Sequence, residues 1–225
     1  PARRTLGAPR HRRAGADRSP SARMSATATR RAVPVSPDLL AGAAQAAADG
    51  FFENEIWVWL LRRDWQRRRL LPRHYRAMIR RVYLPRRAAW TTPDTLGASL
   101  WFPPGTLELS ARERLAEVFS LLPEGIDCFA RAARWEELIA RHHPRESHWY
   151  LQTLSVAPGH QRQGVGTALL EPGLERADAE GLPVYLETQR ESNVPYYRRF
   201  GFELTETIGL DDSPRLWLMW RPAGG

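Results

Sequence analysis

One short segment in the second half of the sequence has the residue types and spacing of a ligand-binding loop. The segment Gln161-Arg162-Gln163-Gly164-Val165-Gly166-Thr167 separates a pattern typical of a strand from a pattern typical of a helix. Glycine lets a backbone approach a ligand closely, and the N–H groups at a helix start attract phosphate. The segment therefore predicts a phosphate-binding loop. A tight strand-to-helix turn without a ligand is the alternative.

Two common nucleotide-binding motifs are excluded for this loop. A dinucleotide fingerprint needs a third glycine near position 169, where this chain has Leu169. A Walker loop needs a lysine, and the chain contains none. Coenzyme A is a diphosphate ligand that requires neither motif, so it is the ligand that this loop favours.

Two motifs in sequence order strengthen this interpretation. Leu154-Ser-Val-Ala-Pro158, followed by Gln161-x-x-Gly164-x-Gly166, resembles the acyl-CoA motif of the GNAT acetyltransferase superfamily. About 30 residues later, Asn193-Val-Pro-Tyr-Tyr197 and Arg-Phe-Gly201-Phe202 fall at the spacing of that superfamily. The resemblance covers roughly residues 148–203, where the chain is similar to the puromycin N-acetyltransferases. Residues 50–85 and 103–146 match poorly.

The resemblance implies an α+β fold, with a mostly antiparallel mixed sheet of six to seven strands flanked by helices. The sheet would be splayed where the strand ending near Val156 leaves the strand Val184–Thr188. Acetyl-CoA, as the acyl donor, would lie in this wedge. Its predicted contacts are the backbone of Leu154, Ser155 and Val156, the loop Gln161, Arg162, Gln163, Gly164, Val165, Gly166 and Thr167, and Asn193.

The resemblance also implies two catalytic side chains. Glu187 can accept the proton of the attacking amine, directly or through water. Tyr197, four residues after Asn193, can donate a proton to the departing thiolate. The alternatives are a salt bridge from Glu187 to a nearby arginine and a packing role for Tyr197.

Charge and composition restrict the remaining classes of function. The chain has 225 residues, a net charge of +8 and one cysteine, Cys128, so an internal disulfide is excluded. Residues 1–30 hold eight arginines and one acid, so residues 31–225 are nearly neutral and predict no nucleic-acid partner. No apolar run reaches the ~20 residues of a membrane span. We expect a disordered Arg-rich leader over 1–25, one domain over 26–225 and a cytoplasmic location.

Periodicity and capping residues predict the elements of this domain. They are a strand over Ala26–Val33, a helix from Ser36 or Asp38 through Ala48, helical structure over Glu55–Tyr83 interrupted near Pro72, strands over Ala88–Thr92 and Ala98–Phe102, helices over Ser110–Leu122 and Ile126–Arg141, a strand over Trp149–Val156, a helix over Gly164–Glu180 kinked at Pro172, a strand over Val184–Thr188, a short helix over Val194–Arg199 capped by Asn193, and strands over Phe202–Thr207 and Leu216–Arg221.

The remaining candidate residues are expected to have structural or surface positions. His142, His143 and His148 suggest metal or base chemistry, but a histidine pair in a loop is more often solvated, and we predict no metal site. Cys128 is expected in the core, as are most of Trp57, Trp59 and Trp65. The arginines of Arg62–Arg87 are expected on a solvated helix face.

The resemblance thus implies an acetyl-CoA-dependent N-acetyltransferase that acetylates an amine of a small molecule, such as an antibiotic-like compound. Acetylation of a protein or peptide amine is the first alternative. A non-catalytic acyl-CoA-binding regulatory module is the second. The oligomeric state stays open.

Overall fold

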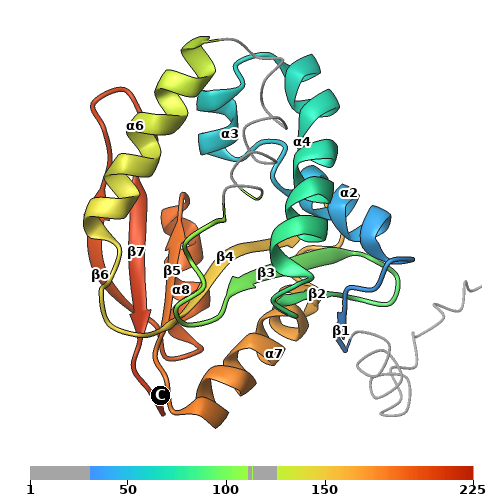
Figure 1. Cartoon of the computed structure of the whole chain (residues 1–225), viewed down its shortest axis with the longest axis vertical. Coiled ribbons are helices and arrows are strands. Elements are labelled where there is room, and N and C mark those ends of the chain that lie inside the picture. The colour runs from blue at the N-terminus through green and yellow to red at the C-terminus, as the bar shows by residue number, and fades with distance from the viewer. Residues whose placement is uncertain (1–30, 111–112, 114–125, 225) are drawn as a thin grey trace, which may run out of the picture.

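The computed structural model describes residues 31–110, 113 and 126–224, and its strands form a single sheet (Figure 1). The strands are β1 (Val33–Pro34), β2 (Ala89–Thr91), β3 (Gly97–Phe102), β4 (Trp149–Val156), β5 (Val184–Thr188), β6 (Glu203–Ile208) and β7 (Leu216–Arg221). Their order is β1-β2-β3-β4-β5-β7-β6, and every neighbouring pair is antiparallel except β4 and β5. The predicted α+β fold with a mostly antiparallel sheet is confirmed.

Helices cover both faces of the sheet and create two buried apolar clusters. They are α2 (Leu40–Gly50), α3 (Glu55–Leu60), α4 (Asp64–Met78) with a π-helical turn over Ile79–Tyr83, α6 (Ile126–His142), α7 (Val165–Glu180), a 3₁₀ turn over Glu191–Asn193, and α8 (Val194–Arg198). One cluster joins α2, α3, α4 and α6 to one face, and the other joins α7 and α8 to the opposite face. Since side chains alternate along a strand, β2, β3, β4, β5 and β7 each contribute to both clusters.

The separation of β4 from β5 is the feature of the sheet that matters most for function. Only Trp149, Tyr150 and Leu151 pair with β5, opposite Val184–Leu186, although β4 runs on to Val156. The last five residues of β4 pair with β3 alone, apart from Gln152, which is bulged. Beyond this point Glu187 and Thr188 of β5 pair with β7. The predicted splay is therefore present in the strand pairing.

Close packing fixes α7 against the sheet on one side of this splay. A Cβ at Gly173 would lie 2.3 Å from the Trp101 ring, so only glycine lets the indole pack flat on the helix. The helix continues through Pro172, whose predicted effect was a kink. Gly164 and Gly181, both with positive φ, begin and end α7 as the sequence suggests.

The first third of the chain differs from the sequence prediction at several boundaries. In the described residues, the first strand lies at Val33–Pro34, and α2 begins at Leu40 without a side-chain cap from Ser36 or Asp38. The helical segment breaks at Leu61–Arg63, where the backbone becomes extended, and Pro72 lies inside α4. Buried Arg67 stabilises that break, because its guanidinium donates to the Leu61 carbonyl at 2.7 Å and to Asp64.

The second half follows its prediction closely. The bounds of β4, β5 and β7 agree with the predicted ones, those of α6, α7 and α8 differ by one residue at one end, and β6 is shifted by one residue at both ends. Ser110 and Glu113 exchange the hydrogen bonds of a capping box. The rest of the predicted helix to Leu122, and the predicted leader over 1–25, lie outside the described residues. No helix within the described ranges is long and apolar enough to cross a bilayer.

Candidate active site

The predicted ligand-binding loop lies at the N-terminus of α7, beside the free end of β4. Gly164 has φ 86° and Arg162 has φ 57°, so the chain turns through left-handed conformations before the helix begins. The side chains of Gln161 and Gln163 donate to the carbonyls of Val156 and Gly159, which braces the loop. The exposed backbone at Arg162–Gly164 leads directly into the first turn of α7. This arrangement is a backbone cradle at a helix start.

Within this turn, Val165 is buried and fixes the helix, whereas Gly166 and Thr167 are half-buried. A Cβ at Gly166 would lie 3.1 Å from the Tyr196 hydroxyl, which reaches across from α8. That hydroxyl is buried and has no hydrogen-bond partner among the described residues. Burial raises the pKa of the Tyr196 phenol, so it stays a neutral donor. The motif in the sequence points to Tyr197 and not to its neighbour Tyr196.

The predicted backbone contacts on β4 lie where this strand has left β5. Leu154 and Val156 are half-buried, and the Ser155 side chain points to the other face, where its hydroxyl bonds the carbonyls of Ala46 and Ala47 in α2. Ser155 can therefore offer only its backbone to a ligand. Gln152, the bulged residue, is exposed in mid-sheet and accepts a hydrogen bond from Tyr83.

Tyr197 lies in the cluster formed by α7, α8 and the sheet. Its side chain is buried, with its ring centroid 5.8 Å from Phe202 and 5.1 Å from Tyr196. Burial raises the pKa of the Tyr197 phenol well above its ordinary value. The hydroxyl is thus a neutral group that can donate a proton or a hydrogen bond, which is the state that the predicted role requires.

Glu187 lies on the opposite face of the sheet from Tyr197, in an aromatic surrounding. Its side chain is 6% exposed, and Oε2 accepts a hydrogen bond from the Tyr150 hydroxyl at 2.6 Å. Oε1 is buried without a hydrogen-bond partner in the described part of the chain. No arginine pairs with this carboxylate there, so the alternative of an Arg–Glu salt bridge does not hold within those residues. Burial and the Glu187 charge raise the pKa values of Tyr150 and Tyr185.

The adjacent pair His142 and His143 was expected to be solvated, and this is wrong for His143. His142 is partly exposed and pairs with Glu206 on β6. The His143 side chain is 10% exposed, with Nδ1 3.9 Å from Glu187 Oε1, and His148 is 9% exposed. The Nε2 atoms of His143 and His148 are 3.1 Å apart. The sequence concealed this because α6, β4 and β5 meet only in the folded chain. No metal-binding group of three ligands occurs among the described residues.

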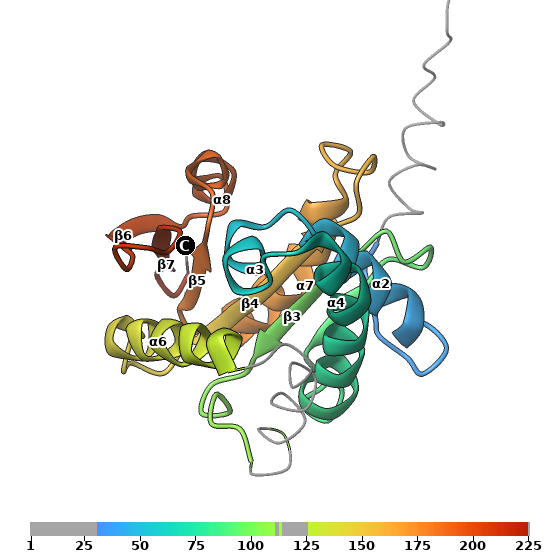
Figure 2. The ribbon, with the colours of Figure 1, turned by 90° about the horizontal axis from the view of Figure 1, so that it is seen from above.

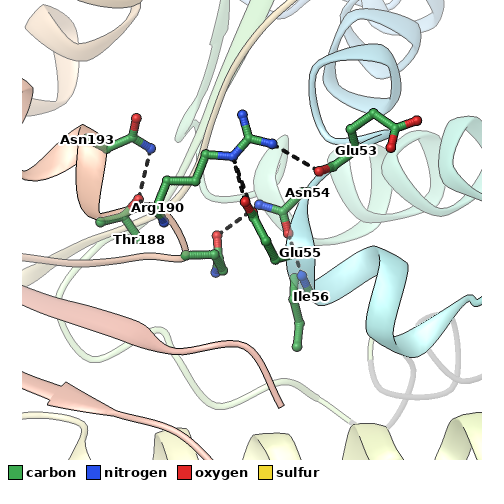
Figure 3. Close-up of polar contacts among 8 residues, drawn as sticks. Glu53, Asn54, Glu55, Ile56, Thr188, Arg190 and Asn193 are labelled. Atoms are coloured by element: carbon green, nitrogen blue, oxygen red, sulfur yellow. Dashed lines mark hydrogen bonds and ion pairs between the residues drawn. The ribbon is translucent and has the colours of Figure 1, made fainter. Parts of the chain in front are cut away.

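Segment 53–55, at the start of α3, is tied to the end of β5 and forms a strap (Figure 3). The Asn54 amide donates to Gln189 Oε1 at 3.0 Å, while its oxygen caps α3 through the Ile56 N–H. Arg190 donates to the Glu55 carboxylate at 3.0 Å and to the Glu53 carbonyl at 2.9 Å. Figure 2 shows α3 between α8 and α4, on the side where β4 and β5 part.

Asn193 belongs to the same end of β5. Its amide donates to the Thr188 hydroxyl at 2.9 Å and does not cap α8, although Asn193 is the N-cap residue. Among the tryptophans, Trp57 and Trp59 pack against the core, whereas Trp65 is 53% exposed, contrary to expectation. Cys128 is buried as predicted.

Comparisons with known proteins agree with this geometry. The model of the Acetyltransferase (GNAT) family matches residues 129–202. An uncharacterized N-acetyltransferase of Schizosaccharomyces pombe is 27% identical over 186 residues, which is 75% of this chain and 72% of that protein. A mycothiol acetyltransferase of Streptomyces avermitilis is 37% identical over 86 residues, 35% of this chain and 28% of that protein.

Solved structures share the fold. A structure described as histone acetyltransferase HPA2 and related acetyltransferase, from Corynebacterium glutamicum, aligns with a TM-score of 0.63 at 24% identity, covering 87% of this chain and 97% of that one. An arylalkylamine N-acetyltransferase from Aedes aegypti aligns with a TM-score of 0.56 at 14% identity, covering 86% and 99%. Together with the splayed strands, the family match over residues 129–202 and the relatives named as acetyltransferases indicate a GNAT N-acetyltransferase, and the solved structures share its fold.

Proposed function

We propose that the enzyme transfers the acetyl group of acetyl-CoA to the amino group of a small molecule. The observation that carries this proposal is the parting of β4 and β5, with a glycine cradle at one end and the buried Glu187 carboxylate beside it. The pyrophosphate fits the N–H groups of Arg162–Thr167, because Gly164 and Gly166 present no Cβ there. The Tyr196 hydroxyl supplies an unused donor over the same turn.

The reaction needs a proton acceptor for the amine and a proton donor for the thiolate. Glu187 has one oxygen held by Tyr150 and one without a partner, so the second oxygen accepts the amine proton, directly or through water. Tyr197 stays protonated because it is buried, and its phenol supplies the donor for the leaving thiolate. Holding the two substrates together contributes a further large share of the rate.

Two observations favour a small acceptor. The strap joins segment 53–55 to residues 189–190, closing the end of the sheet where a long peptide would have to pass. The side chains on the Glu187 face are mainly aromatic, among them Trp59 and Trp135 with ring centroids 6.0 Å apart.

The test is acetyl-CoA consumption against a panel of amines that includes puromycin, arylalkylamines and N-terminal peptides. We expect turnover with a small amine and no faster turnover with any peptide. Faster turnover with peptides would replace the proposal with protein acetylation.

Cofactor binding is tested separately by thermal unfolding. Saturating acetyl-CoA should raise the Tm of the wild type by mass action. Gly164→Val should abolish most of this shift, because Gly164 has φ 86° and a branched residue is strained there. Absence of any shift in the wild type would contradict acetyl-CoA as the donor. A shift without turnover of any amine would favour a binding module.

A further inference from the structure

A chain of polar contacts leads from Glu187 to the molecular surface. Glu187 Oε1 faces His143 Nδ1 at 3.9 Å, the two histidine Nε2 atoms are 3.1 Å apart, and His148 Nδ1 is 2.6 Å from the Glu146 carbonyl oxygen. His143 Nδ1, Glu187 Oε1 and the Tyr185 hydroxyl are all buried and lack a hydrogen-bond partner of good geometry in the described ranges, and the Tyr185 phenol interacts with the Glu187 carboxylate from the same strand. Buried polar atoms without partners are rare, so two that face each other call for an explanation.

Hydrogen-bond chemistry assigns the protons along this chain. A carbonyl oxygen only accepts, so His148 Nδ1 must carry a hydrogen. In a neutral ring His148 Nε2 is then an acceptor, and the hydrogen between the two rings belongs to His143 Nε2. His143 Nδ1 therefore carries no hydrogen and can only accept a hydrogen bond. Burial lowers the pKa of His148, which agrees with the neutral form.

This arrangement leaves a place for one additional proton between Glu187 and His143. Two acceptors, Glu187 Oε1 and His143 Nδ1, face each other at a distance too short to admit a bridging water and too long for a hydrogen bond. One added proton would satisfy both atoms, and a small movement of the ring would close the gap. The proton that a reacting amine gives to Glu187 is such a proton.

The surroundings give this proton a route to solvent. His143, His148 and Tyr150 line a hollow of about 300 Å³, together with the surface residues Arg145, Glu146 and Ser147. The ring of His143 is held by Tyr150 from β4 and Tyr185 from β5, with centroids 5.1 and 4.9 Å away. The other titratable or charged groups nearby are His142 with Glu206 on β6, Arg145, and Glu146.

We infer that Glu187 and His143 act together as the proton acceptor of the transfer reaction, with His148 fixing the tautomer of His143. This inference rests on the proposed function. In the step, the amine nitrogen forms its bond to the acetyl carbon and loses a proton to Glu187, which shares it with His143 Nδ1. At the same time the C–S bond of acetyl-CoA breaks, and the coenzyme A thiolate leaves with the proton of Tyr197, which Tyr197 regains from solvent. The resulting imidazolium keeps its Nε2–H bond to His148. One proton then leaves to water in the hollow, which restores the starting pair before the next turnover.

The kinetic test compares three histidine variants with the best amine of the panel. We expect His143→Gln to lower kcat about 10- to 100-fold near pH 7, with KM for acetyl-CoA within about twofold. The loss should shrink as pH rises, because water and hydroxide then remove the proton unaided. His148→Gln should cost less, about 3- to 10-fold. His142→Gln is the matched control, because His142 is adjacent and contacts Glu206 on the surface, and it should stay within about twofold.

Imidazole rescue separates a chemical role from a packing role. The hollow beside His143 is large enough for free imidazole, so imidazole should restore part of the activity of His143→Ala and none of that of Glu187→Gln. A His143→Gln enzyme with the wild-type pH profile, or a control that loses as much activity as His143→Gln, would overturn the inference.

A readout independent of activity covers variants that fold poorly. Nitrogen NMR of the wild-type imidazoles should show His143 with its proton on Nε2 at neutral pH, and this preference should weaken in His148→Gln. A wild-type His143 with its proton on Nδ1 would overturn the inference. If the wild type acetylates no amine, the proposed function fails first, while the tautomer measurement still decides whether the proton position between Glu187 and His143 exists.

Discussion

Two glutamates of this protein are largely shielded from water, and their neighbours differ in kind. The Glu113 side chain is 14% exposed and pairs with Arg86, itself 13% exposed. The hydrogen bond from Arg86 lowers the pKa of Glu113 to about 2. The Glu187 side chain is 6% exposed and has a phenol and an imidazole beside it, with no arginine among the described residues. The Arg86 cation holds Glu113 in an ion pair that serves the structure. Glu187 has no such partner there, and one of its oxygens is available to accept a proton.

Replacement of Glu187 should give the largest effect and tests the reactive side of this contrast. Glu187→Gln keeps the size of the side chain and an oxygen that can accept from Tyr150, but it removes the base. We expect kcat to fall about 100- to 1,000-fold at pH 7, with the loss decreasing at higher pH as more amine is neutral. The free energy of unfolding should change by less than about 1 kcal/mol, because no buried cation loses its partner. A large loss of stability with little loss of kcat would show that Glu187 has a structural role and not a catalytic one.

Tyr197→Phe tests the proposed proton donor, which lies on the opposite face of the sheet from Glu187. The ring that packs on Phe202 stays, and only the hydroxyl is removed. We expect kcat to fall about 10- to 100-fold with KM for acetyl-CoA nearly constant, since the phenol acts on the thiolate as it forms. Single-turnover kinetics should locate the loss in the chemical step. Wild-type single-turnover rates would leave Tyr197 as a packing residue.

Glu113→Gln should affect stability and leave acetyl transfer nearly unchanged. It leaves the shielded Arg86 without its carboxylate, at a cost of about 2 kcal/mol in the free energy of unfolding at pH 7. Because the folded-state pKa is depressed, the contribution of Glu113 is fully present above the unfolded pKa of about 4.5 and is lost as pH falls toward 2. Urea unfolding of both proteins should therefore show a difference that narrows below pH 4.5. A difference that stays constant with pH would argue against the ion pair.

The exposed glutamate of the strap should give the smallest effect. Glu55 and Arg190 have side chains 41% and 47% exposed, so Glu55→Gln should lower stability by less than about 1 kcal/mol. Loosening the strap should raise KM for the amine about two- to fivefold and leave KM for acetyl-CoA unchanged. Glu137→Gln is the matched control, since it breaks an exposed pair with Arg141 away from the strap. Equal kinetic effects in both variants would remove the strap from acceptor binding.

The part of the site that the sequence predicts is the part whose residues are close in sequence. The loop Gln161–Thr167, the strand Val184–Thr188 and Tyr197 lie within a single stretch, so their motif and spacing are visible without a structure. The surroundings of Glu187 were not visible, because Tyr150, His143 and His148 come from other elements and only the strand register brings them together. Tyr196 was missed because its hydroxyl is aimed by α8 at Gly166.

Errors in the fold have similar physical causes. Pro72 was expected to break a helix, but the break occurs where Arg67 reaches back to the Leu61 carbonyl, a contact between side chain and backbone that no pattern of apolar residues encodes. The bulge at Gln152 likewise depends on the pairing of β4 with β3 and leaves no mark in the sequence.

The parting of β4 and β5 gives the sheet two additional open edges in its interior. An open edge is a template on which a strand of another molecule can pair, and proteins ordinarily cover or charge such edges to avoid aggregation. Here the strap closes this region through Arg190 and Asn54, at the cost of only a few surface contacts. We expect the bonds drawn in Figure 3 to protect these edges as well, so that a protein with an opened strap forms oligomers before it unfolds.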